Sequence, residues 1–213
     1  MKENTVVTTL AELLAFLERV TLAGIRRRDM VSAINRVCEM AGTTPPSVPA
    51  EAPRLREMLS RIRPAAHGVS AKSYSNQRSL LAAALQLAGI IDPLGRGSAR
   101  CHPQWKPLLD AVADNQRLSN GIAAFANWCA NHGISPGEVN DGAVQRFLTW
   151  LETKTLYPKP RDCVRRVPHI WNEASEKFDF WPPTELTTLS FKSPAEHLKW
   201  SDLSPSFQQE ADT

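Results

Sequence analysis

The sequence has no long apolar segment and little cysteine. No run of apolar residues approaches the ~18 that a membrane-spanning helix needs, and residues 1–10 are mostly polar, unlike a signal peptide. We therefore expect no membrane partner. The cysteines form no Cys-x-x-Cys pair, so we expect reduced, buried thiols in the cytoplasm rather than a disulfide framework. They are widely spaced, at Cys38, Cys101, Cys129 and Cys163.

The sequence also lacks the short motifs that carry catalysis. It contains no Gly-rich phosphate loop, no His-Glu-x-x-His and no local Ser/His/Asp or Cys/His arrangement. Cys129 and His132 have the spacing of half a zinc site, but no second half with matching spacing exists. These absences predict a protein that is not an enzyme, with no metal, no cofactor and no small-molecule substrate.

The positive charge is concentrated in the first half of the chain. The net charge of +3 is small for 213 residues, but residues 1–110 hold 15 Lys and Arg against 9 Asp and Glu. Residues 111–213 hold 10 against 13, and most of that acid lies after Ile170. Of the 25 cations 17 are arginine, which suits bidentate phosphate contacts. The distribution favours a polyanionic partner for the folded part of the chain.

Apolar spacing predicts four helices in residues 1–91, the first expected module. A capping box of Thr9 and Glu12 should begin the first helix, and Gly42 should end the second. Prolines make residues 43–53 a stiff connector. Ser70 or Ser73 should cap the fourth helix. The expected helices cover about 10–24, 27–41, 55–62 and 70–87.

A Gly/Pro-containing linker at 92–107 should separate this module from a second at 108–180. We expect a short helix near 105–113 and longer helices at about 119–131, 141–151 and 159–178, where Asn140 or Asp141 caps the middle one. Pro168 should kink the last helix. Residues 181–213 should form an irregular acidic tail, with a short extended segment at 186–191. The fold class is thus all-α, two small helical bundles joined by a linker.

The two modules share a weak internal repeat. Cys38 and Gly42 coincide with Cys129 and Gly133 at an offset of 91, and Lys72 and Arg78 coincide with Lys159 and Arg165 at an offset of 87. Apolar positions also match, for example Leu55 with Val144 and Leu59 with Leu148. Helical periodicity alone can explain these apolar matches, but it explains the coincident glycines and cations less easily. A duplicated helical module is our interpretation.

Three segments resemble the core-binding, SAM-like domain of tyrosine recombinases, the phage-integrase family. They are Trp128-Cys-Ala-Asn-His-Gly-Ile-Ser-Pro136, Val144-Gln-Arg-Phe-Leu-Thr-Trp-Leu151 and Pro158-Lys-Pro-Arg-Asp-Cys-Val-Arg-Arg166. The resemblance covers about 118–178, and 9–90 more weakly. It implies a domain that forms half of a clamp around duplex DNA at the bacterial nucleoid, with a recombinase protomer as a further partner.

The chain departs from the family in its catalytic residues. None of the five histidines is followed by arginine three residues later, and the two tyrosines, Tyr74 and Tyr157, lie inside or beside the helical modules. The resemblance therefore implies DNA binding and not strand transfer. The expected phosphate contacts are Lys72, Arg78, Lys159, Arg161, Arg165 and Arg166.

Two alternatives remain open from the sequence. The arginines of an amphipathic helix can simply solvate its outer face, and the chain can be a helical protein–protein or accessory module of a mobile-element recombinase complex. Salt dependence separates DNA binding from helix docking, because only phosphate neutralisation releases many counterions. The tryptophans are expected to pack in the core rather than to stack on bases; they include Trp105, Trp128, Trp150 and Trp171.

Overall fold

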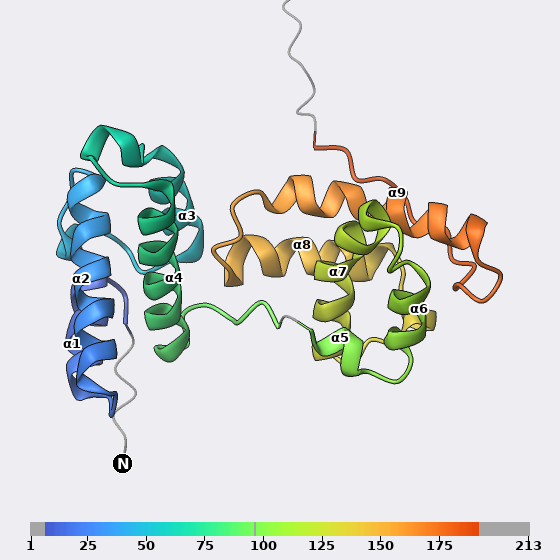
Figure 1. Cartoon of the computed structure of the whole chain (residues 1–213), viewed down its shortest axis with the longest axis horizontal. Helices are drawn as coiled ribbons and strands as arrows, with labels where there is room; N and C mark the ends of the chain where they lie inside the picture. Colours follow the sequence, from blue (N-terminus) through green and yellow to red (C-terminus); the bar gives the residue numbers. More distant parts are fainter. Residues whose placement is uncertain (1–6, 96, 192–213) are drawn as a thin grey trace, which may run out of the picture.

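The computed structural model describes residues 7–95 and 97–191, and all their regular secondary structure is helical (Figure 1). Within these residues the sole strand-like pairing is an isolated bridge between Thr9 and Pro49. The helices gather in two bundles with separate hydrophobic cores, one drawn from residues 10–91 and the other from 99–186. The expected all-α class is confirmed. No helix of the described residues has the length and apolar content to cross a bilayer.

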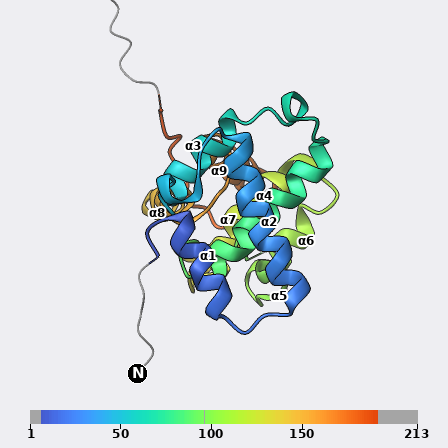
Figure 2. The ribbon, with the colours of Figure 1, turned by 90° about the vertical axis from the view of Figure 1, so that its left-hand side faces the viewer.

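The first bundle contains four α-helices and two 3-10 turns (Figure 2). Leu13, Ile34, Leu55 and Leu81, one from each α-helix, are fully buried in its core. The α2 and α4 helices pack side by side, and α1 covers α2. The elements are α1 (Leu10–Arg19), α2 (Gly24–Met40), η1 (Pro45–Ser47), α3 (Ala52–Arg61), η2 (Pro64–His67) and α4 (Ala71–Leu87).

The first helix begins with the expected capping box. The Thr9 hydroxyl accepts a hydrogen bond from the Glu12 amide at 3.2 Å, and the Glu12 carboxylate accepts one from the Thr9 amide at 3.3 Å. Thr9→Ala should lower the free energy of unfolding by about 1 kcal/mol, because it orphans the Glu12 amide. Urea unfolding followed by circular dichroism measures the loss. Thr9→Ser keeps the acceptor and should stay close to the wild type; equal losses in both variants would contradict a capping role.

The second bundle packs α7 against α9 and closes it with α8 on one side and α5 and α6 on the other. Phe125, Phe147 and Trp171 are fully buried at its centre. Asn140 is the cap of α8, accepting a hydrogen bond from the Ala143 amide at 3.0 Å. The elements are α5 (Ser98–Cys101), α6 (Trp105–Ala111), α7 (Gln116–Asn131), η3 (Pro136–Glu138), α8 (Asp141–Lys154) and α9 (Pro160–Lys177).

The second bundle is larger than the expected 108–180 at both ends. Ala99 and Trp105, placed in the linker by the sequence, are fully buried in its core. Trp181 and Leu186, placed in the tail, are also buried, and both the amide and the carbonyl of Leu186 bond to the Asn172 side chain. No strand forms at 186–191 in the described part of the chain, because this segment bonds to side chains of α9 and α8 instead of to another strand. The tail after 191 lies outside the described residues.

The α9 helix runs through Pro168 without a break. Pro168 has no amide to donate, and its ring is buried against the core. Apolar residues on both sides of it, Val164, Val167 and Trp171, occupy one buried face. Continuous packing on this face holds the helix together across the missing hydrogen bond. The kink expected at 164–168 stays a prediction.

The two glycines matched by the internal repeat adopt the same backbone conformation. Gly42 and Gly133 both have a left-handed φ, of 65° and 68°, directly after α2 and α7. The amides that follow them donate to equivalent carbonyls, Thr43 to Cys38 at 3.0 Å and Ile134 to Cys129 at 2.9 Å. Each glycine turn continues into a 3-10 turn and then two α-helices, which in the first bundle are separated by the additional turn η2. The two bundles thus share a helix, a glycine turn and a 3-10 turn in the same order, and they differ in the η2 turn between α3 and α4. Duplication of a module stays a prediction.

Candidate nucleic-acid interface

The N-terminal end of α9 carries four of the six cations expected to contact phosphates. Lys159 precedes the helix as its N-cap, and Arg161, Arg165 and Arg166 follow within its first two turns, all with exposed side chains. No side chain caps this helix end, and Pro160 occupies its first turn. The first amides of a helix carry a partial positive charge, which adds to the charge of the four side chains.

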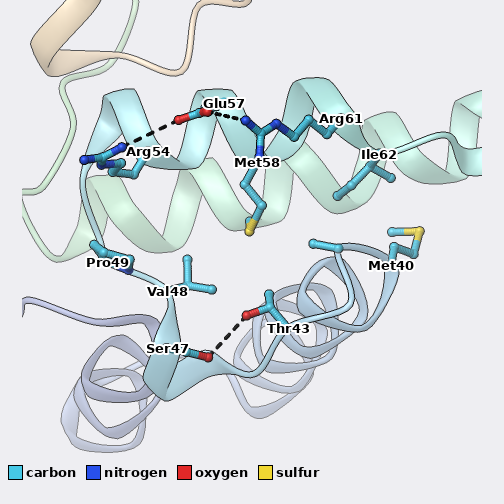
Figure 3. A pocket seen from close by; sticks show the side chains of 11 residues that line it. Met40, Thr43, Ser47, Val48, Pro49, Arg54, Glu57, Met58, Arg61 and Ile62 are labelled. Carbon is cyan, nitrogen blue, oxygen red and sulfur yellow. Dashed lines mark hydrogen bonds and ion pairs between the residues drawn. The ribbon is translucent and has the colours of Figure 1, made fainter.

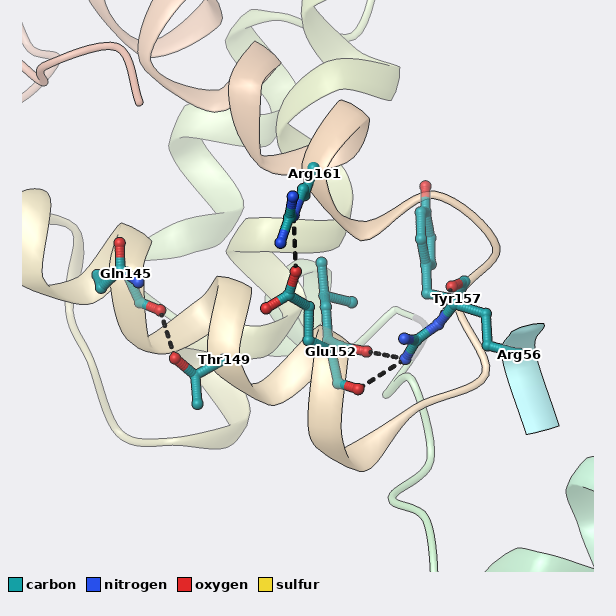
Figure 4. Close-up of polar contacts among 7 residues, drawn as sticks. Arg56, Gln145, Thr149, Glu152, Tyr157 and Arg161 are labelled. Carbon is teal, nitrogen blue, oxygen red and sulfur yellow. Dashed lines mark hydrogen bonds and ion pairs between the residues drawn. The ribbon is translucent and has the colours of Figure 1, made fainter. Parts of the chain in front are cut away.

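Two of these arginines have carboxylate partners. Arg161 Nε lies 3.0 Å from Glu152 Oε1 on α8 (Figure 4), and Arg165 Nη2 lies 3.1 Å from Asp162 Oδ1. The arginine side chains are 64% and 58% exposed, respectively. Exposed pairs of this kind are worth at most about 1 kcal/mol. A phosphate can therefore compete with these carboxylates for both guanidinium groups.

Arg166 lies on a different side of α9, because consecutive helical residues are turned by about 100°. Together with Arg117, His169 and polar residues of α7 it lines a groove of about 590 Å³. Gly121 lets the two helices approach here, since a Cβ at this position would lie 2.7 Å from Ile170 Cγ1. Among the described residues Arg166 forms no ion pair, whereas Arg117 pairs with Glu173. The groove therefore presents two arginines and a histidine beside Ile170 and the polar side chains of α7.

Arg117 did not stand out in the sequence. It is an isolated cation in the first turn of α7, far from α9 in the chain. Its place beside Arg166 follows from the packing of α7 on α9, which no local pattern encodes. Any phosphate that reaches Arg166 through this groove also meets Arg117.

The two expected contacts in the first bundle lie apart from each other. Arg78 is half-buried on α4, its guanidinium carbon 5.9 Å from the centre of the Tyr74 ring. It lines a groove of about 290 Å³ that also includes Pro158 of the second bundle. Lys72 is exposed in the first turn of α4, six residues earlier, and lines none of the grooves described here. Only Arg78 therefore reaches the boundary between the bundles.

A wider groove of about 880 Å³ lies between α3 and the start of α9. Lys159 and Arg161 line it from the second bundle, and Arg56 lines it from the first. Glu57, Glu152 and Asp162 also line it, so its charge is balanced. Pro158 belongs both to this groove and to the one that contains Arg78, which places the two grooves side by side.

The two tyrosines occupy structural positions. The Tyr74 hydroxyl donates to the Leu59 carbonyl at 2.9 Å, and burial raises the pKa of this phenol. Burial, with Cys163 beside it, raises the pKa of Tyr157 to about 12. An activated nucleophile needs a lowered pKa or an adjacent base. The surroundings of Tyr74 and Tyr157 instead raise the pKa of each phenol.

The cysteines are placed as apolar side chains, with one exception. Cys38 and Cys129 are buried, and burial raises the pKa of Cys38 to about 11. Cys163 is half-buried, and Cys101 is exposed, contrary to the expected burial of all four. His132 Nδ1 lies 2.8 Å from the Trp128 carbonyl oxygen. The described residues hold no group of three or more His, Cys, Asp or Glu side chains that could bind a metal.

The tryptophans pack largely as expected. Trp105, Trp128 and Trp171 are buried in the second core. Trp150 is half-buried, and its indole nitrogen donates to Asp92 Oδ2 at 2.7 Å. None of these four rings is fully exposed as a platform for a base.

The first bundle has a groove of a different character, of about 440 Å³, between the end of α2, η1 and α3 (Figure 3). Its apolar residues include Met40, Val48, Met58 and Ile62. Three charged residues of α3 stand along its edge, where Glu57 pairs with both Arg54 and Arg61. The groove is mainly apolar and is suited to a side chain or a short peptide segment rather than to phosphates.

Comparisons of the chain with protein-family models, with curated proteins and with solved structures find no significant match.

Proposed function

We propose that this chain binds double-stranded DNA through phosphate contacts, as a non-catalytic, integrase-like region that would clamp duplex DNA for site-specific recombination at the nucleoid. The observation that carries the proposal is the exposed set of Lys159, Arg161, Arg165 and Arg166 at the uncapped start of α9. Phosphate groups bind where side-chain cations and helix amides point the same way.

The charge balance along α9 supports this end of the helix as the contact. Its first seven residues hold Arg161, Arg165 and Arg166 against one carboxylate, Asp162. Toward its other end Glu173 and Glu176 outnumber Lys177. Phosphates are therefore attracted to the N-terminal half of the helix and repelled from its C-terminal half. Such contacts bind the DNA backbone and are indifferent to the base sequence.

Strand transfer is left out of the proposal for a chemical reason. The family that the chain resembles uses a tyrosine nucleophile, and both tyrosines here are protonated hydroxyls with raised pKa values. The histidine and arginine pattern of that chemistry is also missing from the sequence. A recombinase protomer that supplies these residues is the protein partner which this proposal implies.

Fluorescence anisotropy with labelled duplexes of unrelated sequence tests the proposal. Each neutralised phosphate contributes a slope of about −0.9 to the logarithm of affinity against the logarithm of salt concentration, so four to six contacts should give roughly −4 to −5. Affinity should be similar for all duplexes. An undetectable or salt-independent interaction would refute DNA binding through phosphate contacts. A covalent protein–DNA adduct on nicked suicide substrates would refute the non-catalytic role.

A second candidate function is a helical accessory module that binds another protein. The apolar groove of the first bundle favours it, because Met40, Val48 and Met58 offer a surface for apolar side chains. The arginines at its edge suit a partner segment that also carries acidic residues. Docking of this kind buries apolar area and loses little affinity with salt. The same salt series therefore separates the two functions.

A further inference from the structure

Arg56 of the first bundle closes the C-terminal end of α8 in the second bundle (Figure 4). Its Nε donates to the Tyr157 carbonyl oxygen at 2.9 Å. Its Nη2 lies within hydrogen-bonding distance of three more carbonyl oxygens, those of Leu151 at 2.9 Å, Glu152 at 2.8 Å and Thr155 at 2.7 Å. One side chain thus contacts four carbonyl groups of a helix end that belongs to the other core.

The chemistry of this contact is specific to arginine. The last carbonyl groups of a helix have no partner within the helix, and together they carry a partial negative charge. A planar guanidinium offers several donors in a fixed fork and is positive at all ordinary pH values. A lysine at this position would keep the charge but could not serve all four carbonyl groups from one atom.

Two further contacts join the bundles at the same helix end. The Asp92 amide, at the start of the connector, donates to the Lys154 carbonyl at 2.8 Å. Leu156, two residues after the end of α8, packs against the core of the first bundle. Thr155 between them is 1% exposed, and its hydroxyl donates to the Leu151 carbonyl and accepts from the Tyr157 amide. The junction is therefore built from bonded polar groups around an apolar contact.

We propose that Arg56 is a positioning residue that fixes the first bundle on the end of α8. By doing so it holds Arg78 of one bundle next to Lys159 and Arg161 of the other, in the two neighbouring grooves that share Pro158. The positioning role of Arg56 is supported by the contacts at this junction and does not depend on DNA binding. Its use for DNA rests on the proposed function, in which a fixed spacing between cations preorganises the phosphate contacts.

Distances between spin labels on the two bundles measure the positioning directly. Glu18→Cys on α1 and Glu176→Cys on α9 place labels at exposed sites, with Cys101→Ser and Cys163→Ala removing the accessible native thiols. The full chain should give one narrow distance distribution. Arg56→Ala should broaden it. Arg56→Lys should give an intermediate width, because it retains the charge but loses the fork.

Arg54→Ala is the matched control. Arg54 lies on the same helix and forms an exposed ion pair with Glu57 at 3.7 Å, but makes none of the contacts to α8. Its distance distribution should match that of the wild type. Circular dichroism verifies that each variant is folded, which we expect because Arg56 belongs to neither core. If Arg56→Ala does not fold, Arg56→Lys alone decides the width comparison. Unchanged narrow distances in the Arg56 variants, or a broad distribution in the wild type, would overturn the proposal.

DNA binding by the same variants tests the second step. A broader distribution should come with a loss of duplex affinity of roughly threefold or more, since the cations are no longer held in register. Broad distances with unchanged affinity would refute the link to DNA binding, but they would still support Arg56 as a positioning residue. A wild-type chain with narrow distances and no DNA affinity would refute the proposed function and not the positioning.

Discussion

Replacing Trp171 with alanine is expected to destabilise the second bundle by roughly 3–5 kcal/mol. The ring is fully buried and contacts Trp105 and Trp181 edge-on, with ring centres 6.2 Å and 5.4 Å apart. Its indole nitrogen donates to the Thr184 carbonyl at 2.8 Å. The substitution therefore opens a cavity between α6 and α9 and also orphans a carbonyl of the segment that covers them.

Urea unfolding followed by circular dichroism measures this loss. Because the two bundles have separate cores, the variant should unfold its second bundle at lower urea concentration and keep the transition of the first. His169→Ala is the control: this residue lies on the same helix with an exposed side chain, so the change should stay within about 0.5 kcal/mol. A Trp171→Ala loss below about 1 kcal/mol would show that the ring is not central to the core.

The helices could be predicted from the sequence because their signals are local. The predicted end of α4 at Leu87 matches the structure, and Ser70 and Asn140 are the caps. Gly42 ends α2 with a left-handed φ. Each of these features depends on a few consecutive residues, whose apolar spacing or side-chain acceptor acts within one turn. Where the sequence offered two capping residues, the geometry selected one.

The ends of the second bundle could not be predicted from the sequence because they depend on distant contacts. Ala99 lies in a helix of four residues, and Trp181 and Leu186 lie in irregular backbone, so none shows a helical period. They are buried because α7 and α9 offer apolar surface to them. The role of Arg56 also has no local signal in the sequence, because along α3 this residue resembles its exposed neighbours Arg54 and Arg61. Its role depends on a helix end about 95 residues away, which places it beyond local inference.

The candidate site was predicted in composition but not in arrangement. The structure brings four of the six cations together at the start of α9 and sets Arg78 at the bundle junction, while Lys72 stays apart. On α9 itself, helical rotation turns Arg166 away from Arg161 and toward Arg117. The proposed phosphate-binding surface therefore extends around α9 and does not form a single row along it. Both sides must contribute if the proposed function is right.

Substituting Arg165 and Arg166 together with alanine tests whether this surface is used. The double variant should bind every duplex roughly tenfold more weakly and reduce the salt slope by about two. Arg165→Ala also releases Asp162 from its ion pair, which adds a bare carboxylate beside the helix start. The fold should survive, because both residues are exposed while the neighbouring Val167 and Ile170 are buried.

A variant with the same change in net charge separates local contact from general electrostatics. Arg36→Ala with Lys106→Ala removes two cations outside the proposed surface, on α2 and α6, each of which pairs with a carboxylate on its own helix. Its salt slope should stay near that of the wild type, because these residues meet no phosphate in the proposed complex. Fluorescence anisotropy across a salt series, with circular dichroism as the folding control, compares the two variants. If they weaken binding equally, the attraction is a property of net charge; if the Arg165 and Arg166 variant is folded and keeps the wild-type slope, α9 is not the DNA-binding surface.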